Sequence, residues 1–166
     1  MPMFRTRRSR RIRQGFVEII EAALVVPLFL MMLFGMFEYC RFLMVLHLTG
    51  NAARDGTRYA AVNLSKPASF TTTNYTDAGG NVYPSITSYT TSLMGSMQKN
   101  MSGFTITVNA YDQNGNLLTG TTWNSVTFPQ QVGVTVSGTY QPITPLLLFM
   151  PSSIPVSSTV VMVAEG

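Results

Sequence analysis

The fold of this chain is decided by residues 10–62, which read RRIRQGFVEIIEAALVVPLFLMMLFGMFEYCRFLMVLHLTGNAARDGTRYAAV. Arginines come first, an apolar run follows, and the pattern then becomes amphipathic without a strong stop signal. This order predicts one long helix that lies in a membrane over its first half and projects from the membrane over its second half. Residues 63–166 are then expected to form a small head outside the cytoplasm.

Charge is scarce in the chain and is concentrated at its N-terminus. Only 11% of the 166 residues are charged, against roughly 25% in a typical soluble domain. Six of the eleven Lys and Arg residues lie in the first thirteen positions, and without them the net charge of +4 becomes −2. Nucleic-acid binding needs basic residues spread over a folded face, so we predict no nucleic-acid partner.

A basic block that stops where an apolar run begins is typical of the cytoplasmic side of a membrane segment. We therefore interpret residues 1–14 as a basic cytoplasmic leader and residues 15–62 as the helix, with membrane lipid as its first partner. Residues 22–37 carry no charge and span about 24 Å as a helix. A cleaved secretory signal is the alternative, but no small-x-small site follows the apolar run, which favours a retained single-pass anchor.

Polar residues in this helix carry the first site predictions. A carboxylate within a membrane segment is costly and is usually paired, so Glu21 is expected to meet a cationic partner. Pro27 removes one helix hydrogen bond and predicts a kink. Glu38 and Arg41 are three residues apart on one face, and we expect them to pair at the outer boundary of the membrane.

Beyond the membrane, the helix carries a packing seam. Its residues recur at alternating spacings of three and four, as in helices that pack on a partner. They are Phe42, Val45, Thr49, Ala52, Gly56 and Tyr59. Ala52, Gly56 and Ala60 also form a line of small residues, which lets another backbone approach closely. That backbone belongs either to a neighbouring helix or to the sheet of the head itself.

The head is predicted to be α+β, with one short helix and an antiparallel sheet of about four strands. Ser85 opens the helix, and residues 63–83 are read as a loop. Alternation predicts strands over residues 104–111, 132–140 and 157–164, with a weaker one over 122–128. The apolar segment 142–151 is bounded by prolines. We expect it to cover the sheet, the alternative being that it dips into the bilayer surface or a partner.

The sequence contains no set of residues that is typical of a catalytic site. No GxSxG, HExxH or Walker loop is present, and the single cysteine, Cys40, cannot form an intrachain disulfide. The lone His47 has no Cys, His or carboxylate set around it in the sequence. We predict that the protein is not an enzyme and has no cofactor and no metal.

Three segments of the helix together resemble a known family. Residues 21–27 read EAALVVP, residues 34–41 read FGMFEYCR and residues 51–62 read NAARDGTRYAAV. They are similar to the N-terminal signature of TadE-like proteins, the pilin-like minor components of the bacterial tight-adherence (Flp, type IVb) pilus system. Residues 158–162, STVVM, resemble the last strand of the family more weakly. The resemblance implies a pilin-like fold.

The resemblance also implies roles for residues near the leader. In pilin-like proteins, a prepilin peptidase cuts after a glycine that follows basic residues, which here suggests cleavage between Gly15 and Phe16. A carboxylate five residues into the mature helix then faces the N-terminal amine of a neighbouring subunit. Glu21 aligns with that carboxylate by its distance to Pro27, but it would be the sixth mature residue. This offset keeps an unprocessed anchor as the alternative.

The functional expectation follows from the resemblance. It implies a membrane-anchored, pseudopilin-like protein that serves Flp pilus assembly, in the bacterial cytoplasmic membrane with its N-terminus in the cytoplasm. Its partners would be other pilin-like subunits, packed on the seam from Phe42 to Tyr59, and the pilus-assembly or secretion machinery. The alternative is a membrane-tethered envelope or adhesion module that is not incorporated in a pilus.

Overall fold

The computed structural model describes residues 7–143 and 150–164, with side chains from Phe16 onward. Its main elements, in chain order, are α1 (Arg7–Val62), β1 (Tyr75–Thr76), β2 (Val82–Tyr83), α2 (Ile86–Met94), β3 (Met101–Tyr111), β4 (Gln131–Tyr140) and β5 (Ile154–Val163). Short 3-10 helices lie at Ala68–Thr71, Gly95–Asn100 and Trp123–Ser125. A long helix followed by a small α+β head is thereby confirmed.

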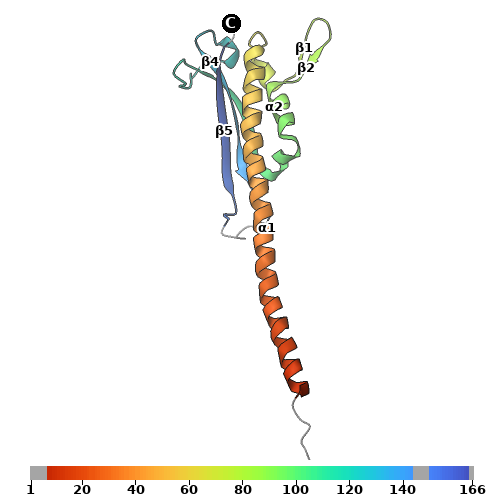
Figure 1. Ribbon diagram of the computed structural model, residues 1–166. Coiled ribbons are helices and arrows are strands. Elements are labelled where there is room, and N and C mark those ends of the chain that lie inside the picture. Colours follow the sequence, from red (N-terminus) through yellow and green to blue (C-terminus); the bar gives the residue numbers. More distant parts are fainter. Residues whose placement is uncertain (1–6, 144–149, 165–166) are drawn as a thin grey trace, which may run out of the picture.

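Helix α1 is the longest element, and the rest of the head packs around its upper part (Figure 1). Its upper part lies between the sheet and α2, and its lower part extends alone. The helix begins at Arg7, earlier than the expected position 15, because nothing in the arginine-rich stretch ends a helix. It ends at Val62 as expected and continues through Pro27.

The described strands form two antiparallel sheets. One is the hairpin β1–β2, and the other has the order β3-β4-β5. The hairpin lies in the region that we had read as a loop. Pro155 lies in β5 at the edge of its sheet, a position where a missing N–H costs little. The apolar segment expected to cover the sheet falls largely on residues 144–149, outside the described residues.

The strand expected over residues 122–128 is wrong. These residues form the 3-10 helix Trp123–Ser125 and an irregular segment. Trp123 and Val126, three positions apart, are both buried in the core, and the indole Nε1 donates to the carbonyl oxygen of Ala68 at 3.3 Å. A short irregular segment that buries bulky residues has the same composition as a weak strand. Composition was therefore a poor guide to the strand predicted here.

The three-stranded sheet is apolar on the side that faces α1 and polar on the other side. In the central strand β4, Val132, Val134 and Val136 are fully buried. The opposite face carries hydroxyl side chains, and Thr135 Oγ1 lies 2.8 Å from Thr159 Oγ1 on the neighbouring strand. Alternation along one-sided strands produces this division. The buried face therefore needs a cover, which α1 supplies.

Thr57 ties α1 directly into the sheet. Its hydroxyl is fully buried and accepts the backbone N–H of Val134 at 3.2 Å. The same oxygen lies 2.7 Å from the carbonyl oxygen of Ala53 in the helix and 3.0 Å from that of Val160 in β5, either of which accepts its proton. One side chain thus satisfies a buried N–H of β4, as buried polar groups require, and lies within hydrogen-bond distance of a carbonyl oxygen of β5.

Gly56 allows α2 to approach α1 closely. A Cβ added at Gly56 would lie 2.4 Å from Thr90 Oγ1 and 3.2 Å from Thr90 Cγ2. Both residues are buried. Helix α2 itself starts after Ser85, whose Oγ accepts the N–H of Ser88 at 3.1 Å as an N-cap. The small residue in α1 therefore sets how tightly the capped helix packs.

We expect Gly56→Ala to destabilise the head by about 1–3 kcal/mol, because the new methyl group overpacks the contact with Thr90. The matched control is Gly50→Ala in the same helix, where the nearest atom to an added Cβ is Ser158 Oγ at 4.0 Å. Removing a helix glycine there is expected to be neutral or to stabilise by up to about 1 kcal/mol. Denaturant unfolding followed by the fluorescence of Trp123, the only tryptophan, measures both.

Relief of the clash provides the second test of this contact. In the Gly56→Ala background, Thr90→Ala should recover part of the lost stability, because it removes the atoms that the new methyl group meets. The Thr90 hydroxyl is buried without a hydrogen bond among the described residues, so its own removal costs little. Equal stability of Gly56→Ala and Gly50→Ala would contradict this account of the packing.

Candidate functional site at the helix–head junction

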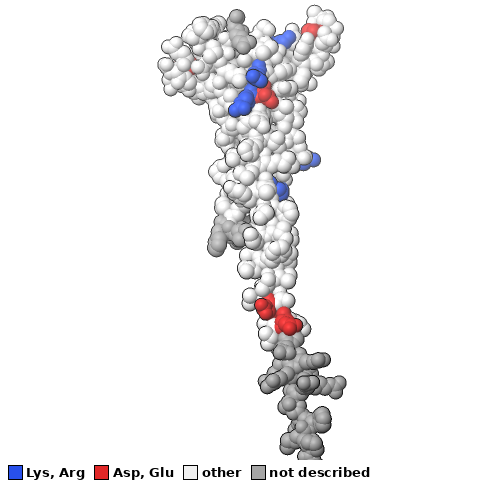
Figure 2. All heavy atoms as spheres, viewed as in Figure 1, with Lys and Arg blue, Asp and Glu red and all other residues white. Residues whose placement is uncertain are grey.

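The lower part of α1 is an apolar surface that no other element among residues 7–143 and 150–164 covers. It is long and apolar enough, by length and composition, to cross a membrane. Large apolar side chains stay exposed on all sides of this part: Phe16, Val17, Ile19, Ile20, Leu24, Val25, Val26, Leu28, Phe29, Leu30, Met31, Met32, Phe34, Met36 and Phe37. Figure 2 shows uncharged side chains over the lower helix, with acidic atoms only near its lower end. The helix is therefore compatible with a single-pass membrane anchor.

Glu38 lies at the point where the exposed helix meets the head, and it is buried there, with 7% of its surface exposed. Its Oε1 accepts the hydroxyl proton of Tyr140 at 2.5 Å and the backbone N–H of Ile143 at 3.2 Å. Arg41 Nη1 lies 3.3 Å from the same oxygen. The predicted Glu38–Arg41 pair thus exists as part of a larger site that joins α1 to the end of β4.

Hydrogen bonding and charge explain why this carboxylate is tolerated in the interior. A buried carboxylate without partners is strongly unfavourable, whereas this one has two donors from the head and one cation from its own helix. Burial, and then the hydrogen bond to Glu38, raise the pKa of Tyr140 to about 12, against a lowering effect of Arg41. Tyr140 therefore keeps its proton and acts as a donor at neutral pH.

Tyr140 is the residue of this site that sequence reasoning missed. Alternation placed it on the buried face of β4, but nothing in the local pattern pairs it with a residue a hundred positions earlier. Its ring packs on Phe42, with centroids 5.6 Å apart. The available signal was chemical. A tyrosine buried at a strand end needs a partner for its hydroxyl, and Glu38 is the carboxylate that follows the apolar run of α1.

The seam of α1 packs on the head of the same chain. Val45, Ala52 and Gly56 are buried there. Phe42 contacts Tyr140, and Tyr59 stacks on Tyr89 with centroids 4.3 Å apart. Of the two covers that the sequence left open, the structure has the sheet and α2 of the head. The buried part of the seam is therefore covered by the chain's own head, and the packing of other pilin helices on this seam stays a prediction.

The residues singled out near the leader lie on the exposed part of α1. Gly15 and Phe16 are within the helix, and Phe16 and Glu21 have exposed side chains. Within the described part of the chain, Glu21 has no hydrogen bond or ion pair to the head. Among those same residues, no group of three His, Cys, Asp or Glu side chains could hold a metal, and His47 and Cys40 are exposed.

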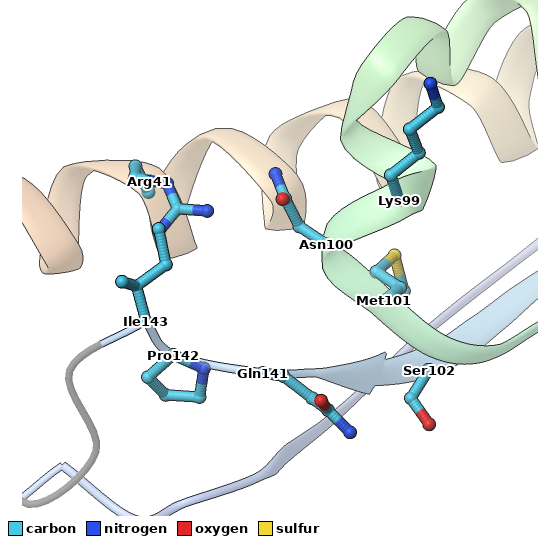
Figure 3. Close-up of a pocket in the computed structure, with 8 residues that line it drawn as sticks. All are labelled: Arg41, Lys99, Asn100, Met101, Ser102, Gln141, Pro142 and Ile143. Atoms are coloured by element: carbon cyan, nitrogen blue, oxygen red, sulfur yellow. The ribbon is translucent and has the colours of Figure 1, made fainter.

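An open hollow of about 290 Å³ lies beside the junction. Arg41 approaches it from α1, Lys99 and Asn100 from the 3-10 helix that follows α2, and Gln141 and Ile143 from the segment after β4 (Figure 3). Three elements far apart in the sequence thus meet here. The lining includes two cations and no carboxylate.

A family model described as TadE-like protein matches residues 17–58. The match covers the exposed part of α1, the Glu38–Arg41 pair and most of the seam, so the resemblance seen in the sequence is confirmed over this helix. The match suggests a protein associated with a Tad pilus, and the TadE-like family is of a structural, non-enzymatic kind. No curated protein and no solved structure matches the chain.

We expect Tyr140→Phe to lower the free energy of unfolding of the head by about 1.5–3 kcal/mol, because a buried charged acceptor loses its donor. The control is Tyr39→Phe on the adjoining turn of α1, which removes a hydroxyl from an exposed side chain that has no hydrogen bond in the described structure. Denaturant unfolding, followed by the fluorescence of Trp123, compares the two variants. Equal losses would contradict a special role for Tyr140.

The stabilising effect of Tyr140 should also disappear in alkali. Its pKa is about 12 in the folded chain, above the ordinary value of 10.0, so the protonated form favours folding. The contribution is complete below the unfolded pKa and is lost as pH rises through the folded one. The stability difference between wild type and Tyr140→Phe is therefore expected to shrink between pH 10 and 12. A constant difference would contradict the proposed hydrogen bond.

Proposed function

We propose that this protein is a membrane-anchored, pseudopilin-like component of Tad pilus assembly. The observation that carries the proposal is the coincidence of the TadE-like match, residues 17–58, with a helix that is bare and apolar below Glu38 and buried in a head above it. In this proposal, residues 16–37 cross the cytoplasmic membrane. The arginine block of the leader stays in the cytoplasm, as the positive-inside rule favours, and the head lies outside.

The division of α1 into two parts supports a mechanical role. Its upper part belongs to the core of the head through Thr57, Gly56 and the seam, and the junction at Glu38 binds the helix to β4. Helix and head therefore move as one body. Lateral contact with other pilin-like subunits falls to residues 16–37, whose side chains stay free, and Glu21 is the carboxylate there that would meet a cationic partner.

Co-purification from native membranes tests this proposal. The chain, tagged at its C-terminus, is expected to co-isolate with the pilus ATPase, the inner-membrane platform and pilin-like subunits after mild cross-linking. Glu21→Ala should reduce recovery of the pilin-like subunits, because the carboxylate loses its partner. Glu18→Ala is the matched control, since it lies one turn nearer the headgroups, and it should leave recovery unchanged.

Recovery of the wild-type chain from the membrane with none of these components would contradict the proposal. It would favour the alternative, an envelope or adhesion module tethered by the same kind of anchor. Equal recovery with Glu18→Ala and Glu21→Ala would contradict the role of Glu21 alone.

Processing by a prepilin peptidase belongs to the same proposal. We expect the chain isolated from its native membrane to start at Phe16, because Gly15 follows a basic leader as in pilin-like proteins. The mass of the intact chain measures this directly. A start at Met1 or Pro2 would contradict processing and would make the arginine block a permanent part of the anchor.

A further inference from the structure

The open hollow at the junction lies where the anchor leaves the membrane, and this placement rests on the proposed insertion of α1. Residues 16–37 form an exposed apolar helix of about 33 Å, close to the roughly 30 Å of a bilayer hydrocarbon core. The outer surface of the membrane is then level with Glu38 and Arg41. Ile143, at the rim of the hollow, is 70% exposed, and Tyr39, next to Glu38 in the sequence, is 55% exposed.

The charges of this hollow are suited to an anion. Arg41 neutralises Glu38 through Nη1, the one nitrogen of its guanidinium that donates a hydrogen bond within the described structure. The other N–H groups of a guanidinium remain free to bind a second acceptor. Lys99 is exposed and forms no ion pair with a described carboxylate. The junction therefore keeps one net positive charge beside a recess.

An apolar rim distinguishes this recess from a surface patch that carries only charged side chains. Ile143 and Pro142 lie below α1, with Arg41 between them and the helix, while Lys99 lies beyond Asn100 and its ammonium points away from Arg41 (Figure 3). Aromatic and apolar side chains next to cations are typical of the headgroup level of a membrane protein. A ligand that fits must carry negative charge at a polar end and apolar matter directly below it.

We infer that the hollow binds the phosphate of an anionic phospholipid in the outer leaflet, with the Arg41 guanidinium as its ligand and Lys99 as a second positive charge that favours an anionic lipid at this surface. Arginine binds phosphate through paired N–H donors and lysine as a point charge. The acyl chains would then lie along the exposed helix below Glu38. The bound lipid would hold the head at a fixed height above the membrane. Its negative charge would be attracted by cations that have few partners among the described residues.

Lys99→Gln tests the inference without touching the junction at Glu38. The full chain is placed in nanodiscs of mixed phosphatidylcholine and phosphatidylglycerol, and the lipids that stay bound are counted by native mass spectrometry. Loss of one lysine at a membrane surface is expected to lower the ratio of phosphatidylglycerol to phosphatidylcholine bound roughly fivefold at this site. The matched control is Lys66→Gln, since Lys66 lies over the ring of Tyr75 in the head, with Nζ 4.0 Å from its centroid.

The comparison of the two lysine variants is the decisive one, because the arginine block can hold anionic lipid on the other leaflet in every variant. The same retention by Lys99→Gln and Lys66→Gln would overturn the inference. So would inorganic phosphate binding that depends on Lys99 in phosphatidylcholine nanodiscs without any preference for phosphatidylglycerol. Failure of the chain to enter nanodiscs would instead overturn the anchor, and this inference with it.

Discussion

The buried carboxylate of Glu38 is the constraint on which the arrangement of helix and head depends. A carboxylate taken out of water must be surrounded by donors or cations, and Tyr140, the N–H of Ile143 and Arg41 supply them. Because Tyr140 ends β4 and Ile143 lies in the segment after it, these bonds hold the head at this height along α1. The same interaction thus joins the two parts of the molecule and sets where the exposed apolar helix begins.

Above this point, α1 serves as an element of the core rather than as a stalk. Thr57 accepts a backbone N–H of β4 and lies within hydrogen-bond distance of a carbonyl oxygen of β5, and Gly56 allows α2 to pack closely on the helix. A surface helix of a globular protein usually has one apolar stripe. Here the upper stripe is covered by the sheet and α2, and the lower part is apolar all round, as a segment in lipid or in a helix bundle must be.

Much of the architecture could be predicted from the sequence because its signals are local. An apolar run followed by an amphipathic pattern predicted the long helix up to Val62, and alternation predicted β3, β4 and β5. The strand expected around Trp123 failed because burial there follows the shape of the core rather than a period. Of the site, Glu38 and Arg41 were visible because they are three residues apart on one helix, whereas Tyr140 approaches them only after the chain has folded back.

The sequence by itself determined the long apolar helix, the charged residues on either side of its apolar run and the α+β class of the head, since each depends on neighbouring residues and on their preference for water or an apolar environment. Only the tertiary structure decided what covers the seam and what surrounds Glu38. Small residues at regular spacing allow close approach by any backbone, and a carboxylate accepts any donor. The path of the chain decides which of these groups meet, because it brings β4 and α2 back against α1.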